Sequence, residues 1–172
     1  MGRGITDDLN RALWNMARDS TGQLNDLNFL NGAPLERVLR AYEYSCAVCG
    51  FDVRLETMSV ALEAAHIKWH QAGGSDEESN GLALCTMHHK LFDRGVFTLS
   101  DKMKVIVSES ANGTKGFQEW VIAFHGSSIR APQRRNYYPD KVAVEWHVSE
   151  VFQSPGRCEN PEAQISMRNP TR

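Results

Sequence analysis

The 172-residue chain is 41% hydrophobic and 23% charged, a composition typical of one globular domain with at most a small appended arm. No apolar run approaches the roughly 20 residues that span a bilayer, and the N-terminus lacks the apolar stretch of a signal peptide, so we expect a cytoplasmic protein without a membrane partner. The formal net charge of −2 leaves nucleic acid open as a partner, because affinity for phosphates depends on local Lys and Arg side chains.

The first forty residues predict a helical arm. Residues 6–19 place apolar side chains on one helical face, and Pro34 opens a second helical pattern, PLERVLRAYEY. The stretch 20–33 between them is rich in Asn and Gly and predicts a loop. We therefore assign residues 1–40 to an N-terminal helical arm.

The middle of the chain predicts two short strands followed by a helix. Residues 60–66 and 81–85 are short apolar runs, and the polar, Gly-rich stretch 71–80 between them predicts a loop. Residues 86–94 fit a helix, and Gly95 is a suitable residue for ending it.

The rest of the chain predicts further elements of the same domain. VFTL and MKVIVS predict a hairpin around SDK, whereas FQEWVIAFHG fits a helix or a strand equally well. VAVEWHVSEVF ends the part that we expect to be ordered. We assign residues 41–153 to the main domain and residues 154–172, with three prolines and few large apolar side chains, to a loosely ordered tail.

Two spaced pairs of residues predict a structural zinc site. Cys46 and Cys49 form a CxxC pair, and Cys85 and His88 form a CxxH pair, with 35 residues between the two pairs. Thiolates and imidazole suit Zn²⁺, which takes four tetrahedral ligands in structural sites. A Cys₃His zinc would close a loop and stabilise a domain whose core is small. The fourth cysteine, Cys158, lies outside this pattern.

A second group of polar residues is arranged around the loop that the zinc would close. His66 ends the first predicted strand, Asn80 precedes the second, and His89 directly follows a zinc ligand. Consecutive helical residues point about 100° apart, so His89 faces away from the zinc and shares a face with Asp93. One short helix can thus serve two metal sites.

These residue types fit metal-assisted phosphodiester hydrolysis. A histidine with an unperturbed pKa near 6.5 is a suitable general base for activating water, which assigns that role to His66. A histidine and a carboxylate one helical turn apart can bind a divalent cation, which assigns His89 and Asp93 to the catalytic metal. Asn80 either orients His66 or braces the loop.

The stretch CAVCG…LEAAHIKWHQAGG…NGLALCTMHHKLFDRGVFTL resembles HNH endonucleases, and more narrowly the HNH domain of modification-dependent restriction enzymes that recognise phosphorothioated DNA. The resemblance covers about residues 40–155. It implies an α+β, ββα-metal fold with His66, Asn80 and His89 at the active site. It also implies dependence on Mg²⁺ or Mn²⁺ and cleavage of DNA that leaves 5′-phosphate and 3′-hydroxyl ends.

The sequence departs from these families in two respects. Many HNH enzymes have an Asp or His metal ligand immediately before the base, where this chain has Ala65, so we expect Asp93 beside His89 to hold the metal. Enzymes of the narrower family also carry an upstream domain that reads the modified DNA. The residues before Cys46 are too few for such a domain, which predicts a stand-alone nuclease or one targeted by a separate protein or domain.

We expect DNA as the partner, a role in restriction or defence, and leave a homodimer open. The alternative function is a zinc-stabilised nucleic-acid-binding module without catalysis; an effector or toxin nuclease is a third hypothesis. The basic stretch 128–142 has four basic residues and one acidic residue, and pairs Arg134 and Arg135 with tyrosines that can stack on bases. The predicted DNA contacts are Lys68, Lys90, Arg94, Arg134 and Arg135.

Overall fold

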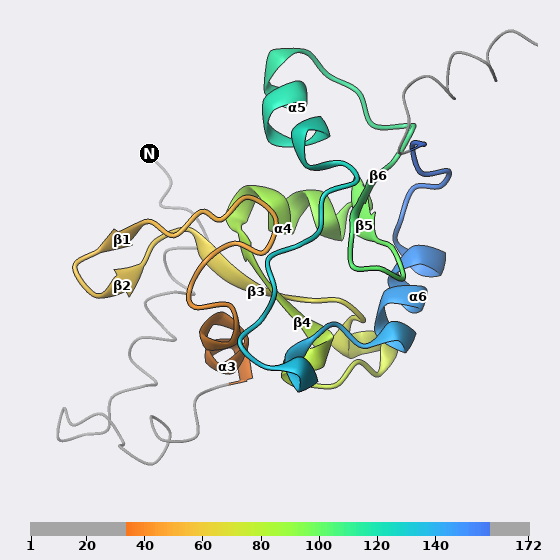
Figure 1. Ribbon diagram of the computed structural model, residues 1–172. Helices are drawn as coiled ribbons and strands as arrows, with labels where there is room; N and C mark the ends of the chain where they lie inside the picture. The colour runs from red at the N-terminus through yellow and green to blue at the C-terminus, as the bar shows by residue number, and fades with distance from the viewer. Residues whose placement is uncertain (1–33, 159–172) are drawn as a thin grey trace, which may run out of the picture. The chain divides into compact units, whose positions relative to one another are not determined.

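The computed structural model describes residues 34–158, which combine helices and strands (Figure 1). The α-helices are α3 (Pro34–Ala41), α4 (Thr86–Asp93), α5 (Lys115–Trp120) and α6 (Lys141–Glu150). The strands are β1 (Arg54–Leu55), β2 (Met58–Ser59), β3 (Leu62–His66), β4 (Gly81–Cys85), β5 (Phe97–Leu99) and β6 (Val105–Val107). This confirms the predicted α+β class, whereas the helix predicted for residues 6–19 and the loop for residues 20–33 lie outside the described residues.

The centre of the fold is an antiparallel pair of strands followed directly by a helix. β3 pairs with β4 in a register that sets Leu62 opposite Cys85 and His66 opposite Gly81. α4 begins at the residue after β4 and contacts both strands. The order strand, loop, strand, helix is the one that the sequence predicts for this segment.

The end of α4 is fixed by Gly95, the residue predicted to stop it. Its φ of 67° is left-handed, a conformation that residues with a side chain rarely adopt. A Cβ atom at this position would lie 2.1 Å from the carbonyl oxygen of Val151, so the close approach of the C-terminal segment also requires glycine. The predicted hairpin follows as β5 and β6, with Phe97 opposite Val107.

Helix α3 packs on the central hairpin. It contacts β3 and β4, and Val38, Ala41 and Tyr42 are buried. These apolar positions recur at helical spacing, which explains why the segment folds as a helix against the strands. Residues 34–40, which the sequence grouped with the N-terminal arm, therefore belong to the same compact unit as the strands.

The second half of the described chain adds two further helices. The segment 117–126, for which the sequence left helix and strand open, is helical: it contains part of α5 and a single 3₁₀ turn, Ile122–Phe124. α6 begins after Asp140, whose carboxylate accepts the backbone N–H of Ala143 at 3.2 Å. None of the helices in the described part of the chain has the length and apolarity needed to cross a membrane.

Residues 154–158, which the sequence assigned to the tail, are held by backbone hydrogen bonds. The carbonyl oxygen of Pro155 accepts the N–H of Glu109 at 2.9 Å, and the N–H of Arg157 donates to the carbonyl oxygen of Val107 at 2.8 Å. The packed part of the chain thus extends a few residues further than the composition suggests.

His147 is a fully buried histidine that joins α6 to the central helix. Its ring stacks on that of Phe92 with centroids 3.7 Å apart. Nε2 donates to the carbonyl oxygen of Phe92 at 3.2 Å, and the hydroxyl of Thr98 donates to Nδ1 at 2.9 Å. Burial lowers the pKa of His147 from 6.5 to about 4, although the hydrogen bond to Phe92 acts in the opposite direction.

This environment predicts acid sensitivity from one residue. Below its ordinary pKa the unfolded chain protonates His147, whereas the folded chain keeps it neutral down to about pH 4. The free energy of unfolding should therefore fall by about 3 kcal/mol between pH 6.5 and pH 4 from this group. Denaturant titrations across this pH range should show that the free energy of unfolding falls less in His147→Gln than in wild type. Parallel curves would contradict the assignment, and the exposed His70→Gln serves as the matched control.

Candidate metal centre and active site

The two predicted pairs of zinc ligands meet in one cluster. The ligand atoms of Cys46, Cys49, Cys85 and His88 all lie within 4.8 Å of one another. Nδ1 of His88 is 3.1 Å from Sγ of Cys85 and 3.8 Å from Sγ of Cys46, and Sγ of Cys49 is 4.0 Å from Sγ of Cys85. A tetrahedral zinc with Zn–S bonds near 2.3 Å has edges of about 3.8 Å. The donor set and its spacing therefore fit a zinc ion.

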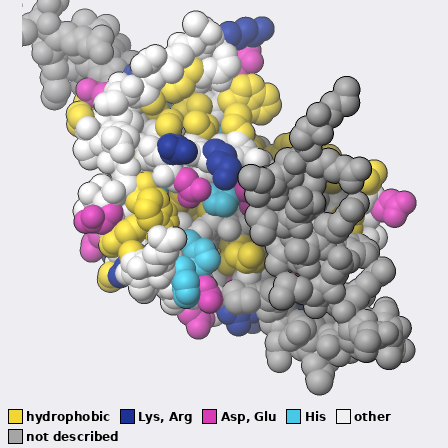
Figure 2. Space-filling model, turned by 180° about the vertical axis from the view of Figure 1, so that it is seen from behind, with side chains coloured by type: hydrophobic (Ala, Val, Ile, Leu, Met, Phe, Trp, Pro, Cys, Tyr) yellow, Lys and Arg dark blue, Asp and Glu magenta, His cyan; other side chains and the backbone are white. Residues whose placement is uncertain are grey.

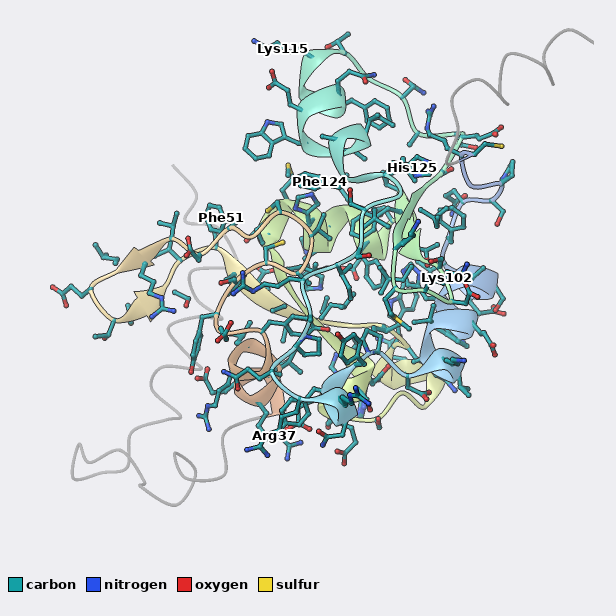
Figure 3. The ribbon with its side chains drawn as sticks, in the orientation of Figure 1. Arg37, Phe51, Lys102, Lys115, Phe124 and His125 are labelled. Atoms are coloured by element: carbon teal, nitrogen blue, oxygen red, sulfur yellow. The ribbon has the colours of Figure 1, made fainter. Side chains whose placement is uncertain are left out.

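The surroundings of His88 fix which ring nitrogen faces the cluster. Nε2 donates to the carbonyl oxygen of Trp120 at 3.0 Å, which leaves Nδ1 as the ligand atom. Phe124, labelled in Figure 3 between α5 and α4, packs edge-on against the His88 ring with centroids 5.5 Å apart. Residues far along the chain thus orient one zinc ligand.

The thiols form an electrostatically coupled group. Hydrogen bonds with Cys49 and Cys85 lower the pKa of Cys46, whereas the contact with Cys46 raises the pKa of Cys49. Burial opposes protonation of His88, but hydrogen bonds to Cys46 and Cys85 outweigh it and raise its pKa to about 9. The Cys46 thiolate is ready to bind a dication, which would displace the protons that Cys49 and His88 hold.

His89 points away from this cluster, as the helical periodicity predicts. Its Nδ1 lies 2.6 Å from Oε2 of Glu63, and its Nε2 lies 3.5 Å from Oδ2 of Asp93. The predicted pair of His89 and Asp93 is thus brought together, one helical turn apart. Glu63, on β3, is a third member that the sequence prediction missed.

His66 lies at the end of β3 with a partly exposed ring. Its Nε2 is 3.0 Å from Oδ1 of Asp76, a residue of the β3–β4 loop that the sequence prediction also missed. The loop is tied to α3, because the guanidinium of Arg37 donates to the carbonyl oxygen of Asp76 at 3.0 Å and lies 3.6 Å from the carboxylate of Glu78. When Asp76 accepts the Nε2 proton, Nδ1 of His66 is free to accept another.

Asn80 is buried beneath this loop, and within residues 34–158 its side chain bonds backbone groups. Its Oδ1 accepts the N–H of Lys68 at 2.9 Å, and its Nδ2 donates to the carbonyl oxygens of Lys68 and Ser75 at 3.0 and 2.7 Å. Gly74 lies against the same turn, where a Cβ atom would be 1.9 Å from the carbonyl oxygen of Lys68. Of the two roles left open for Asn80, these bonds correspond to bracing the loop.

His66 and His89 line the same open cavity, of about 520 Å³. Figure 2 shows histidine side chains on one face of the molecule, with acidic and basic side chains beside them. The residues lining the cavity are Ala64, His66, Trp69, His70, Gln71, His89, Asp93 and Arg94. The predicted base and the predicted metal ligands therefore face one space, which Ala65, buried in the core, does not reach.

The predicted DNA contacts are distributed unevenly around this cavity. Arg94 lines it, and Lys90 is exposed on α4. Lys68 holds Asn80 through its backbone. Arg134 and Arg135 are exposed outside the cavity lining, where the Arg134 guanidinium lies 5.7 Å from the centre of the Tyr137 ring.

The two missed carboxylates differ in how far the sequence indicated them. Glu63 lies opposite Leu84 in the strand register, so pairing the two predicted strands places it near the start of α4. Asp76 belongs to an irregular loop, and its contact with His66 depends on the loop path that Asn80 and Arg37 hold. No periodic pattern signals such a contact.

Comparison with known proteins finds a family match for the central segment. Residues 46–100 match a protein-family model described as HNH endonuclease. This segment carries both pairs of predicted zinc ligands together with His66, Asn80 and His89, and the match confirms the resemblance to HNH endonucleases over it. None of the curated proteins matches the chain.

One solved structure to which the chain is similar is described as a modification-dependent TagI restriction endonuclease. The two are 25% identical in sequence, with a TM-score of 0.48, over 70% of this chain and 37% of the TagI chain. The chain thus spans well under two thirds of the length of that enzyme.

The ligand cluster predicts that zinc holds the domain together. Cys46→Ser should lose the bound zinc and lower the thermal unfolding midpoint by about 10 °C or more, because ligand binding and folding of such sites are coupled. Metal content by mass spectrometry and unfolding by circular dichroism measure both effects. Cys158→Ser, outside the cluster, is the matched control and should keep the metal. A Cys46→Ser protein with full zinc content and an unchanged midpoint would contradict the site.

Proposed function

We propose that this protein is a metal-dependent endonuclease that hydrolyses phosphodiester bonds of DNA, with His66 as the general base. The observation that supports this most directly is that His66 and the pair of His89 and Asp93 line one open cavity. The HNH family match over residues 46–100 supports nuclease chemistry in that place.

The groups around His66 suit proton transfer. Asp76, at 3.0 Å, accepts the Nε2 proton and fixes the tautomer, so Nδ1 takes the proton from a water molecule as its oxygen attacks phosphorus. The bond from phosphorus to the 3′ oxygen breaks, and the leaving oxygen takes up a proton from solvent to give 3′-hydroxyl and 5′-phosphate ends. Asp76 acts here as a positioning residue.

His89 and Asp93 would hold the divalent cation, Mg²⁺ or Mn²⁺. When bound, this ion compensates negative charge on the phosphate and the leaving oxygen. Carboxylate and imidazole ligands suit these ions, whereas the thiolates of the neighbouring cluster suit zinc. Two different ions can therefore be held by consecutive residues of one helix.

We extend this proposal to a role in restriction or defence, in the cytoplasm, with target recognition supplied by a separate protein or domain; a homodimer stays open. A zinc-stabilised binding module without catalysis is the alternative, and replacement of His66 distinguishes the two.

Replacing the base should abolish cleavage while leaving the fold intact. His66→Ala should reduce nicking of plasmid DNA in Mg²⁺ or Mn²⁺ by about 10²- to 10⁴-fold, the usual contribution of a general base. Zinc content and the thermal midpoint of the variant should match those of wild type, because the partly exposed His66 ring pairs with Asp76, outside the zinc cluster. Wild-type protein that never nicks DNA, or a variant that nicks equally well, would favour the binding module.

Charge reversal tests the basic patch formed by Arg134 and Arg135. If each arginine contacts one phosphate, Arg134→Glu/Arg135→Glu should weaken DNA binding and reduce the slope of log affinity against log salt by about 2. Lys102→Glu/Lys115→Glu is a control matched in charge, in the β5–β6 turn and at the start of α5 (Figure 3). Equal effects of the two double variants in fluorescence anisotropy would remove the patch from the interface.

A further inference from the structure

Glu63 connects β3 to the first two turns of α4. Its Oε2 lies 2.6 Å from Nδ1 of His89, and its Oε1 accepts the hydroxyl proton of Thr86 at 3.3 Å. Both carboxylate oxygens are thus engaged by one helix. The Glu63 side chain is 42% exposed, whereas that of His89 is 19% exposed, so the contact lies at the edge of the packed interior.

The two ring nitrogens of His89 face different surroundings. Glu63 lies at Nδ1, and Asp93 lies 3.5 Å from Nε2. Among the described residues that line the cavity with His66 are His89 and Asp93, but not Glu63. The Nε2 edge of the ring therefore opens onto the cavity, and the Nδ1 edge is turned toward the strand.

We propose that Glu63 is a positioning residue that accepts the Nδ1 proton of His89 and aims Nε2, together with Asp93, at the catalytic cation. This inference rests on the proposed nuclease function. A neutral imidazole carries one proton, so a proton held on Nδ1 leaves the lone pair on Nε2 for a metal. An anionic acceptor also makes the imidazole a stronger ligand.

This arrangement accounts for metal binding at a site in which alanine, without a ligand atom, precedes the proposed base. The side chain of Ala65 is buried in the core and offers no ligand atom. Glu63, two residues earlier on β3, supplies the carboxylate of the strand instead, but it acts through His89 from outside the cavity lining. The strand thus contributes to metal binding indirectly.

If Glu63 and His89 formed only a surface ion pair, removing Glu63 would have a different effect on metal affinity. Surface ion pairs contribute about 0–1 kcal/mol to the free energy of unfolding. A pair of this kind would leave the affinity of the cavity for a metal ion unchanged. A positioning carboxylate, in contrast, changes metal affinity by about 10- to 100-fold when it is removed. The tautomer of His89 and the affinity for Mn²⁺ therefore separate the two roles.

The first measurement uses the zinc-loaded, full-length protein without catalytic metal. Long-range ¹H–¹⁵N NMR at pH 8 reports which nitrogen of each histidine carries the proton. We expect the Nδ1–H tautomer for His89 in wild type and a shift toward Nε2–H in Glu63→Ala. A wild-type His89 that carries its proton on Nε2, or on both nitrogens at this pH, would overturn the proposal.

The second measurement is the dissociation constant for Mn²⁺, by calorimetry or by electron paramagnetic resonance of the free ion. Glu63→Ala should weaken binding by about 10- to 100-fold, and Glu63→Gln, which keeps an acceptor oxygen without the charge, should weaken it less. Asp93→Asn identifies the specific site by removing a ligand. Glu109→Gln, exposed in the loop after β6, controls for the loss of one charge.

Unchanged Mn²⁺ affinity in Glu63→Ala would overturn the proposal even if wild type cleaves DNA. Conversely, the expected tautomer and affinity changes without any DNA cleavage by wild type would refute the proposed function and leave the role of Glu63 standing. Zinc content and the thermal midpoint of Glu63→Gln verify that the fold is retained, so the result does not depend on the alanine variant alone.

Discussion

The convergence of Cys46, Cys49, Cys85 and His88 is the constraint on which the rest of the domain depends. These residues join the turn after α3 to the junction of β4 and α4, and so close a loop of 35 residues that contains β3 with His66, whereas His89 follows the loop on α4. Ordering such a loop costs conformational entropy that the small core offsets poorly. A zinc ion held by the predicted ligands would bind only the folded arrangement and so would offset this cost.

Around this cluster, the ring of His66, the proposed base, is positioned by several successive contacts rather than by one hydrogen bond. The strand ladder brings His66 to the end of the hairpin, and Asn80 bonds the backbone of the loop. Arg37 of α3 bonds the carbonyl oxygen of Asp76, whose carboxylate contacts the His66 ring. The strand ladder, Asn80 and Arg37 each use a backbone carbonyl or amide as a partner. The path of the backbone on both sides of His66 is therefore fixed largely by main-chain hydrogen bonds.

Much of this architecture could be predicted from the sequence, because it depends on local periodicity. Residues 81–85 and the limits of α4 were predicted from apolar runs and a glycine stop, and the opposite orientations of His88 and His89 result from helix geometry alone. Contacts between distant segments could not be predicted in this way. The contact of Glu63 with His89 depends on the packing of β3 against α4, and that of Asp76 with His66 depends on the path of the loop. The packing of α3 on β3 and β4 likewise depends on tertiary contacts that composition does not indicate.

His88 and His89 are joined by a single peptide bond, yet their side chains face different sides of the helix. An insertion or deletion of one residue between Cys85 and His89 rotates the downstream side chains by about 100°. It would therefore displace ligands of the predicted zinc site and the predicted catalytic metal site together. A substitution at one of these positions, in contrast, would change one predicted site and leave the helix geometry of the other intact. The spacing of both sites is therefore set by the same helical turn.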